Sequence, residues 1–233
     1  MKPPTHDHAG IHILDPKDSL GLKSHYITML QEKALDRYIP KGTAGVAIDL
    51  GCGYGRLTPL LIRKGWTAIG IDPSRESLEY AKQHFPGPEY RQGGLPNLPI
   101  APESASLVLI QNVLRTLKTI GKLDAVRGLG HYVIPGGKIF LVENIRVGHP
   151  DYIPETEIIE IMKREGMHLI KRIPIRSARW WPIYLIRYGL IPKSLFNMIA
   201  NWELRRMEKK KGNPIRQYWN ILFIFEKMDI SHQ

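Results

Sequence analysis

Hydrophobic residues occur along the chain in two alternating patterns. Short continuous apolar runs, as in "GVAIDL" (45–50) and "SLVLIQ" (106–111), predict strands that are buried on both faces. Segments with apolar residues three or four positions apart predict the helices between them. The expected strands are 45–50, 67–71, 89–92, 106–111, 137–143, 167–175 and 218–227, and the expected helices are 19–38, 56–64, 74–84, 119–131 and 155–165. This alternation predicts an α/β fold with a doubly wound, mostly parallel sheet.

Length and composition fit one α/β domain with an insertion. The chain has 233 residues, of which 43% are hydrophobic and 24% are charged, as in ordinary globular proteins. The single cysteine, Cys52, excludes an internal disulfide framework and a cysteine zinc cluster. The start, "MKPPTHDHAG", lacks an apolar segment of the secretory type, so we expect a cytoplasmic protein. We expect no metal site, although His6, His8 and His12 have side chains that can ligate metals.

The stretch "AIDLGCGYGRLT" (47–58) reads as a buried strand, a glycine-rich turn and the start of a helix. A dinucleotide-binding turn would have its third glycine at position 56, where the sequence has Arg56, and a phosphate-binding P-loop would end in Gly-Lys-Ser/Thr. Asp72 ends the next strand, 21 residues after Gly51. A carboxylate there can accept hydrogen bonds from both ribose hydroxyls of an adenosine ligand. The pattern therefore predicts an adenosine-containing ligand other than a dinucleotide.

Four segments together resemble the motifs of class I S-adenosylmethionine-dependent methyltransferases. They are "AIDLGCGYGRLT", "AIGIDPS", "GGLPNLPIAPESASLVLIQNVL" and "YVIPGGKIFLVEN", and the resemblance spans roughly residues 44–145. It implies a Rossmann-like methyltransferase fold with a seven-stranded sheet, with a helical insertion before the last strand. It also implies S-adenosyl-L-methionine as the cofactor and S-adenosyl-L-homocysteine as the product.

The resemblance further implies which residues contact the cofactor. Residues near its methionine part would be Asp49, Gly51, Cys52, Gly53, Gln111 and Asn112, and those near its adenosine part would be Asp72, Pro73 and Leu95. The glycines would let the backbone approach the ligand, because a side chain there would block it. Asp72 would bind the ribose and Asp49 would stabilise the turn.

Three residues are candidates for a general base, which would help methyl transfer to a hydroxyl group. Glu143 and His149 follow the fifth strand, at the edge of an open α/β sheet where ligands bind. His25 lies in the N-terminal helix, which often covers this cleft in the family.

Residues 177–216 form an insertion that is both basic and aromatic. The chain has a formal net charge of +11, and this insertion has nine Lys or Arg against only Glu203 and Glu208. Four of the five tryptophans lie in it or beside it: Trp180, Trp181, Trp202 and Trp219. Prolines and charges keep its apolar runs too short for a membrane span. We expect helices near 183–190 and 194–211 that serve as a lid, a membrane contact, a dimer contact or an RNA-stacking surface.

We therefore expect four parts: a helical cap (1–43), a cofactor-binding α/β domain (44–176), a basic aromatic lid insertion (177–216), and the last strand and C-terminus (217–233). The predicted function is transfer of a methyl group to an oxygen atom of an acceptor. The acceptor is expected to be anionic and either a small molecule or lipid-linked, such as a sugar nucleotide, a glycan or a natural product. RNA or protein methylation, and nucleic-acid binding without catalysis, are alternatives. Homodimer formation and peripheral membrane contact through the insertion also stay open.

Overall fold

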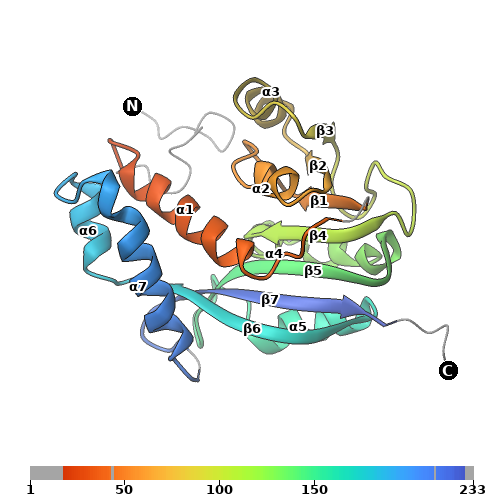
Figure 1. Cartoon of the computed structure of the whole chain (residues 1–233). Helices are drawn as coiled ribbons and strands as arrows, with labels where there is room; N and C mark the ends of the chain where they lie inside the picture. Colours follow the sequence, from red (N-terminus) through yellow and green to blue (C-terminus); the bar gives the residue numbers. More distant parts are fainter. Residues whose placement is uncertain (1–17, 43–44, 213, 229–233) are drawn as a thin grey trace.

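The computed structural model describes residues 18–42, 45–212 and 214–228, so the histidines at positions 6, 8 and 12 lie outside it. Its centre is a seven-stranded sheet with the order β3-β2-β1-β4-β5-β7-β6 (Figure 1). The strands are β1 (Val46–Leu50), β2 (Thr67–Asp72), β3 (Glu89–Gln92), β4 (Ala105–Gln111), β5 (Val133–Ile145), β6 (Met167–Ser177) and β7 (Trp219–Lys227). β7 is antiparallel to both of its neighbours, and the other strand pairs are parallel. The predicted fold class is confirmed.

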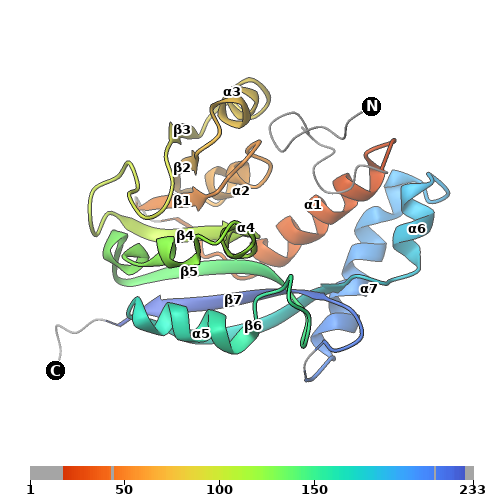
Figure 2. The ribbon, with the colours of Figure 1, turned by 180° about the vertical axis from the view of Figure 1, so that it is seen from behind.

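Helices cover both faces of the sheet (Figures 1 and 2). The α-helices are α1 (Leu22–Asp36), α2 (Thr58–Arg63), α3 (Arg75–His84), α4 (Val113–Thr119), α5 (Glu155–Arg164), α6 (Pro182–Arg187) and α7 (Phe196–Glu208). Successive strand residues enter different cores: Leu107 and Leu109 pack with α1, α2, α6 and α7, whereas Val108 packs with α4 and α5. Since both faces of the central strands are buried, these strands read as continuous apolar runs.

The chain reverses its direction across the sheet between β1 and β4. From β1 it proceeds outward through β2 to β3, and it then returns to β4 on the other side of β1. The loops after β1 and β4 therefore diverge, which opens a crevice at the carboxyl ends of these two strands. This crevice determines where a ligand can bind.

The helix predicted at 119–131 is wrong. The α-helix begins directly after β4, at Val113, and ends at Thr119. Two short 3₁₀ helices follow it, η2 (Leu123–Val126) and η3 (Leu129–Tyr132). Gly121 and Gly128 separate these pieces with φ values of 69° and 86°, which an α-helix cannot contain.

The helical insertion lies between β6 and β7 as expected, and it forms part of the main core. Ile183, Phe196 and Leu204 are buried against α1. The ring of Tyr26 lies 5.6 Å from that of Phe196 in an edge-on arrangement. Its hydroxyl donates a 2.8 Å hydrogen bond to Glu203, and burial raises the pKa of that carboxyl to about 7. Together α1, α6 and α7 therefore form one packed layer at the end of the molecule (Figure 1).

Candidate active site

A cavity of about 500 Å³ lies between the glycine turn after β1 and the start of α1. It occupies the crevice at the carboxyl ends of β1 and β4. Seven of the predicted site residues line it: His25, Asp49, Gly51, Cys52, Gly53, Gln111 and Asn112. The structure thus brings together the residues expected near the methionine part of the cofactor and one candidate base.

Two glycines of the turn have different surroundings. A Cβ atom on Gly51 would collide with Val113 at the start of α4. Gly53 has a φ of 52°, and no atom lies within 4 Å of the position its Cβ would take. The turn is therefore packed tightly against α4 at one glycine and open toward the cavity at the next.

Asp72 holds this turn from the end of β2. One carboxylate oxygen accepts a 2.8 Å hydrogen bond from the Gly53 N–H, and the other accepts a 2.9 Å bond from the Ser74 N–H. Burial raises the pKa of Asp72, although these two bonds oppose the shift. Each carboxylate oxygen can accept a second hydrogen bond, so the group retains capacity for ribose hydroxyls.

Asp72, Pro73 and Leu95 are outside the residues that line this cavity. Pro73 follows β2 and accepts a hydrogen bond from the side chain of Gln92 through its carbonyl oxygen. Leu95 lies in the loop after β3 and is half-buried against the sheet core. The residues predicted for adenosine and for methionine thus lie at neighbouring strand ends, with Asp72 bonded to the turn between them.

Asp49 is buried beneath the turn and accepts a 2.7 Å hydrogen bond from the Thr58 hydroxyl. Burial raises its pKa to about 6. Arg56, whose pKa burial lowers to about 10, lies close enough to Asp49 for the two charges to stabilise each other. The turn therefore contains a carboxylate and a guanidinium with little access to water, which strengthens their field in the cavity.

Side-chain hydrogen bonds of Gln31 connect α1 to the strand ends. Its amide donates to Asn220 at 3.0 Å, and its side-chain oxygen accepts from Arg56 at 2.9 Å and from Gln111 at 2.6 Å. Sequence reasoning assigned no role to Gln31 or Arg56. Two sequence features could have indicated these residues. Gln31 is a polar residue among the buried positions of a helix, and Arg56 is a cation directly after the last glycine of the turn.

The three candidate bases lie in different surroundings. His25 is exposed at the cavity wall, 6.1 Å from the ring of Phe196. His149 lies in the loop after β5, with its ring nitrogen 3.6 Å from the Asp151 carboxylate, and does not line the cavity. Glu143 is buried under α4 and does not line it either.

Glu143 binds the first turn of α4. One of its oxygens accepts hydrogen bonds from the backbone N–H groups of Leu114 at 2.9 Å and Arg115 at 3.4 Å. A carboxylate at this end of a helix satisfies N–H groups that have no partner inside the helix. Burial nevertheless raises the pKa of Glu143 to about 8. These contacts fit a residue that positions α4, and with it Asn112.

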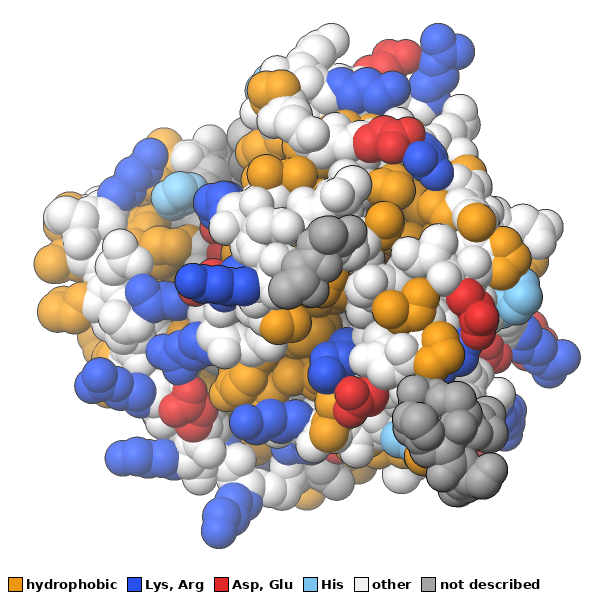
Figure 3. Space-filling view, turned by 45° about the vertical axis from the view of Figure 1, so that its right-hand side comes forward, with side chains coloured by type: hydrophobic (Ala, Val, Ile, Leu, Met, Phe, Trp, Pro, Cys, Tyr) orange, Lys and Arg blue, Asp and Glu red, His pale blue; other side chains and the backbone are white. Residues whose placement is uncertain are grey.

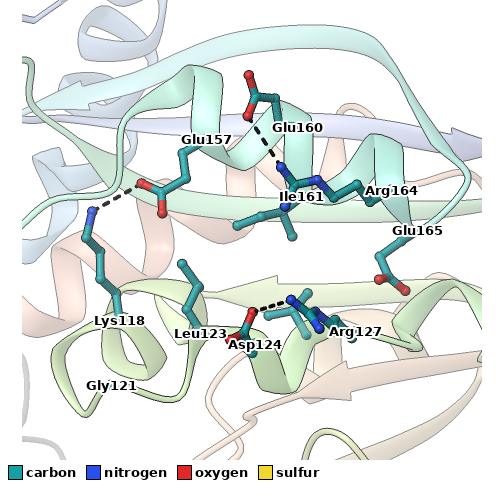
Figure 4. A pocket seen from close by; sticks show the side chains of 11 residues that line it. Lys118, Gly121, Leu123, Asp124, Arg127, Glu157, Glu160, Ile161, Arg164 and Glu165 are labelled. Atoms are coloured by element: carbon teal, nitrogen blue, oxygen red, sulfur yellow. Dashed lines mark hydrogen bonds and ion pairs between the residues drawn. The ribbon is translucent and has the colours of Figure 1, made fainter.

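A second cavity, of about 690 Å³, lies between η2 and α5 (Figure 4). Its charged side chains pair with each other, as in the Lys118–Glu157 ion pair at 3.2 Å and the Asp124–Arg127 pair at 3.1 Å. None of the residues predicted for cofactor binding or catalysis lines it. We therefore assign the active site to the cavity beside the glycine turn.

The family model "Methyltransferase domain" matches residues 48–141, from β1 through the glycine turn into β5. This match and the similar proteins below support a class I S-adenosylmethionine-dependent methyltransferase. The match covers the strand ends that surround the assigned cavity.

Known relatives of this methyltransferase are distant in sequence. An uncharacterized methyltransferase of Mycobacterium tuberculosis is 25% identical over 173 residues, which cover 72% of this chain and 68% of the relative. A 2-phytyl-1,4-naphtoquinone methyltransferase of Thermosynechococcus vestitus is 30% identical over 133 residues, covering 54% and 56% of the two chains. The geranyl diphosphate C-methyltransferase of Streptomyces coelicolor shares the fold, with a TM-score of 0.63, 13% identity and coverage of 95% and 88%.

The residues present fit the cofactor of this family. Gly53 leaves open space on the cavity side of the turn, which suits close approach of a ligand. Asn112 directly precedes α4 with a φ of 55°, and its side-chain oxygen is buried without a hydrogen-bond partner among the described residues. Such an acceptor in the cavity wall suits the ammonium group of a methionine moiety.

Asp72→Ala should weaken the affinity for S-adenosylmethionine at least tenfold, which is about 1.4 kcal/mol. The reason is that we expect Asp72 to accept hydrogen bonds from the ribose, and that it also holds the Gly53 N–H. Isothermal titration calorimetry measures the change, with Asp124→Ala on the exposed η2 as the control. Unchanged affinity of the Asp72 variant would refute the ribose assignment.

Glu143→Gln should make folding stability less dependent on pH. The folded-state pKa of about 8 is above the ordinary value of 4.5, so the native state loses stability as pH rises between these values. The slope contributed by one such group approaches about 1.4 kcal/mol per pH unit. Urea unfolding from pH 5 to 8 should show a flatter curve for this variant, and Glu160→Gln should follow the native protein.

Methyl transfer by Glu143→Gln should persist, because the amide oxygen can still accept from the first turn of α4. Loss of transfer with intact cofactor binding would instead indicate that Glu143 acts as the base. Parallel stability curves for the variant and the native protein would contradict the burial argument.

Proposed function

We propose that this methyltransferase transfers a methyl group to an oxygen atom of a small or lipid-linked acceptor that carries an anionic group. The supporting observation is the mixed character of the cavity wall outside the glycine turn. Apolar side chains at the start of α1 and directly after α3 line it, including Leu20, Leu22 and Phe85. Lys193 of the insertion and His25 of α1 add polar groups that can bind an anion.

Of the basic residues in the insertion, Lys193 is the one placed to contact an acceptor in the cavity. All nine basic residues of 177–216 are among the described residues, and Lys193 is the one that lines the cavity. Arg206 instead donates to the Ser177 hydroxyl at 2.9 Å and packs over Trp180. Lys210 lies over the ring of Trp219. An anionic acceptor would therefore contact one cation of the insertion at the cavity, not the whole basic surface of the insertion.

Two related proteins support an acceptor with an apolar part. The Streptomyces coelicolor enzyme was solved with geranyl diphosphate, an isoprenoid chain with an anionic diphosphate group. The Thermosynechococcus vestitus relative is named for a phytyl naphthoquinone. An apolar wall beside Lys193 would suit an acceptor of the same general kind.

His25 would accept the proton that the acceptor hydroxyl loses. When bound, the cofactor would supply an electrophilic methyl group, which would pass to the acceptor oxygen as the sulfur–carbon bond breaks and a neutral thioether leaves. The chain contributes alignment through the glycine turn and α1, and a proton acceptor at the cavity wall. A positioned general base contributes about 10²–10⁴-fold to such a rate.

His25→Gln should lower kcat by at least tenfold and leave cofactor affinity unchanged, because His25 lies on α1 opposite the turn. His149→Gln is the matched control, since that histidine does not line the cavity. Equal losses in both variants would contradict the base assignment.

Transfer of labelled methyl from S-adenosylmethionine into a fractionated cell extract tests the acceptor class. Label should enter the small-molecule or lipid fraction, and it should be much reduced with Asp72→Ala. Base treatment that cleaves methyl esters but leaves methyl ethers then tells carboxyl from hydroxyl acceptors. Label confined to RNA or protein would overturn the proposal in favour of a macromolecular acceptor.

A further inference from the structure

The outward faces of α6 and α7 are apolar. On α6 the exposed residues Trp181, Tyr184 and Tyr188 follow helical spacing, with exposed fractions of 61%, 50% and 66%. The opposite face of that helix, with Ile183 and Ile186, is buried against α1.

The exposed residues Leu195, Met198 and Trp202 repeat the pattern on α7 and the turn before it. We call these six residues, three from each helix, the outer face. Side chains this large are usually exposed singly, so six of them on two adjacent helices indicate a contact surface.

Cations continue this surface without acidic residues to offset them. Arg205 and Lys209 extend the exposed stripe of α7 by the same three- and four-residue steps. The insertion contains only two acidic residues. Glu203 is fully buried, and Glu208 forms a 2.6 Å ion pair with Arg37. In Figure 3, hydrophobic side chains gather along the left edge of the molecule with Lys and Arg side chains beside them.

The outer face adjoins the mouth of the active-site cavity. The turn after α6 contains Gly189, and the position of its Cβ lies 3.5 Å from Leu20 and 3.6 Å from Leu22. Both leucines line the cavity, as does Lys193 just before α7. Leu20 is itself 60% exposed. Apolar surface therefore runs from the outer face to the opening of the cavity.

We propose that the outer face binds an anionic lipid membrane surface. Tryptophan and tyrosine favour the boundary between lipid chains and headgroups, and helices with apolar residues beside Lys or Arg lie in that plane. Each cation near an anionic membrane adds to the attraction. None of the described helices is long and apolar enough to cross a bilayer. The inference concerns binding alone and does not depend on the proposed acceptor.

Sedimentation with lipid vesicles tests the proposal. The native chain should bind vesicles that contain phosphatidylglycerol more strongly than vesicles of pure phosphatidylcholine, and added salt should weaken this binding. The variant Trp181→Ser, Tyr184→Ser, Trp202→Ser should bind phosphatidylglycerol vesicles at least tenfold more weakly. Its affinity for S-adenosylmethionine should stay unchanged, which shows that the fold is retained.

Two matched controls distinguish binding through the outer face from nonspecific binding to vesicles. Ile62→Ser, Ile120→Ser and Met228→Ser remove apolar groups of comparable exposure elsewhere and should leave vesicle binding unchanged. Arg205→Gln with Lys209→Gln should weaken binding about tenfold, whereas Arg75→Gln with Lys82→Gln on α3 should have little effect.

Three outcomes would overturn the inference. They are absence of vesicle binding, equal binding by the outer-face variant, and equal losses in the outer-face and control variants. A dimer in light scattering that the outer-face variant abolishes, without vesicle binding, would assign the surface to a second copy of the chain. Salt-sensitive RNA binding without vesicle binding would assign it to nucleic acid.

Discussion

The hydrogen bond from the Gly53 N–H to Asp72 holds the site together. It joins the turn after β1 to the end of β2, and so fixes a backbone that has no side chain to anchor it. The same turn is packed against α4 through Gly51 and Val113. Three neighbouring strand ends are thereby held around one ligand-sized space. Larger residues in the turn would fill the space or displace α4.

The closure of the cavity depends on a second set of contacts, made by α1. Gln31 connects that helix to Arg56, Gln111 and Asn220, so cap, turn and sheet share one polar network. Behind α1, the buried Tyr26–Glu203 hydrogen bond connects it to the insertion. The insertion therefore belongs to the core that supports the cavity wall. Removing it would expose this core, which is why point variants are the better probes of its function.

Much of the fold follows from the sequence because the central strands are buried on both faces. Continuous apolar runs predicted β1, β2, β4 and β7 close to their observed bounds, whereas β5 begins four residues before its predicted start at 137. The glycine spacing located the turn. The segment after β4 was predicted less well. Its apolar residues fit a helix at 119–131, but the glycines at 121 and 128 divide it, and the true helix starts where β4 ends.

The candidate site was predictable only where the motif is local. Residues of the turn and of the end of β4 gather as expected, because adjacent strands bring their loops together. The position of Lys193 depends on how α7 packs against α1, over more than 150 residues of separation, and no local pattern contains that information. The same holds for Glu143, whose carboxylate is directed under α4 and away from the cavity.

The central claim is that the cavity between the glycine turn and α1 holds the methionine end of the cofactor, with the acceptor entering beside Lys193. A crystal structure of the chain with S-adenosylhomocysteine tests it most directly. The account predicts the ribose at Asp72 and the sulfur atom close to Gln111 and Asn112, facing α1. A ligand bound between η2 and α5, or one whose sulfur faces away from α1, would contradict it.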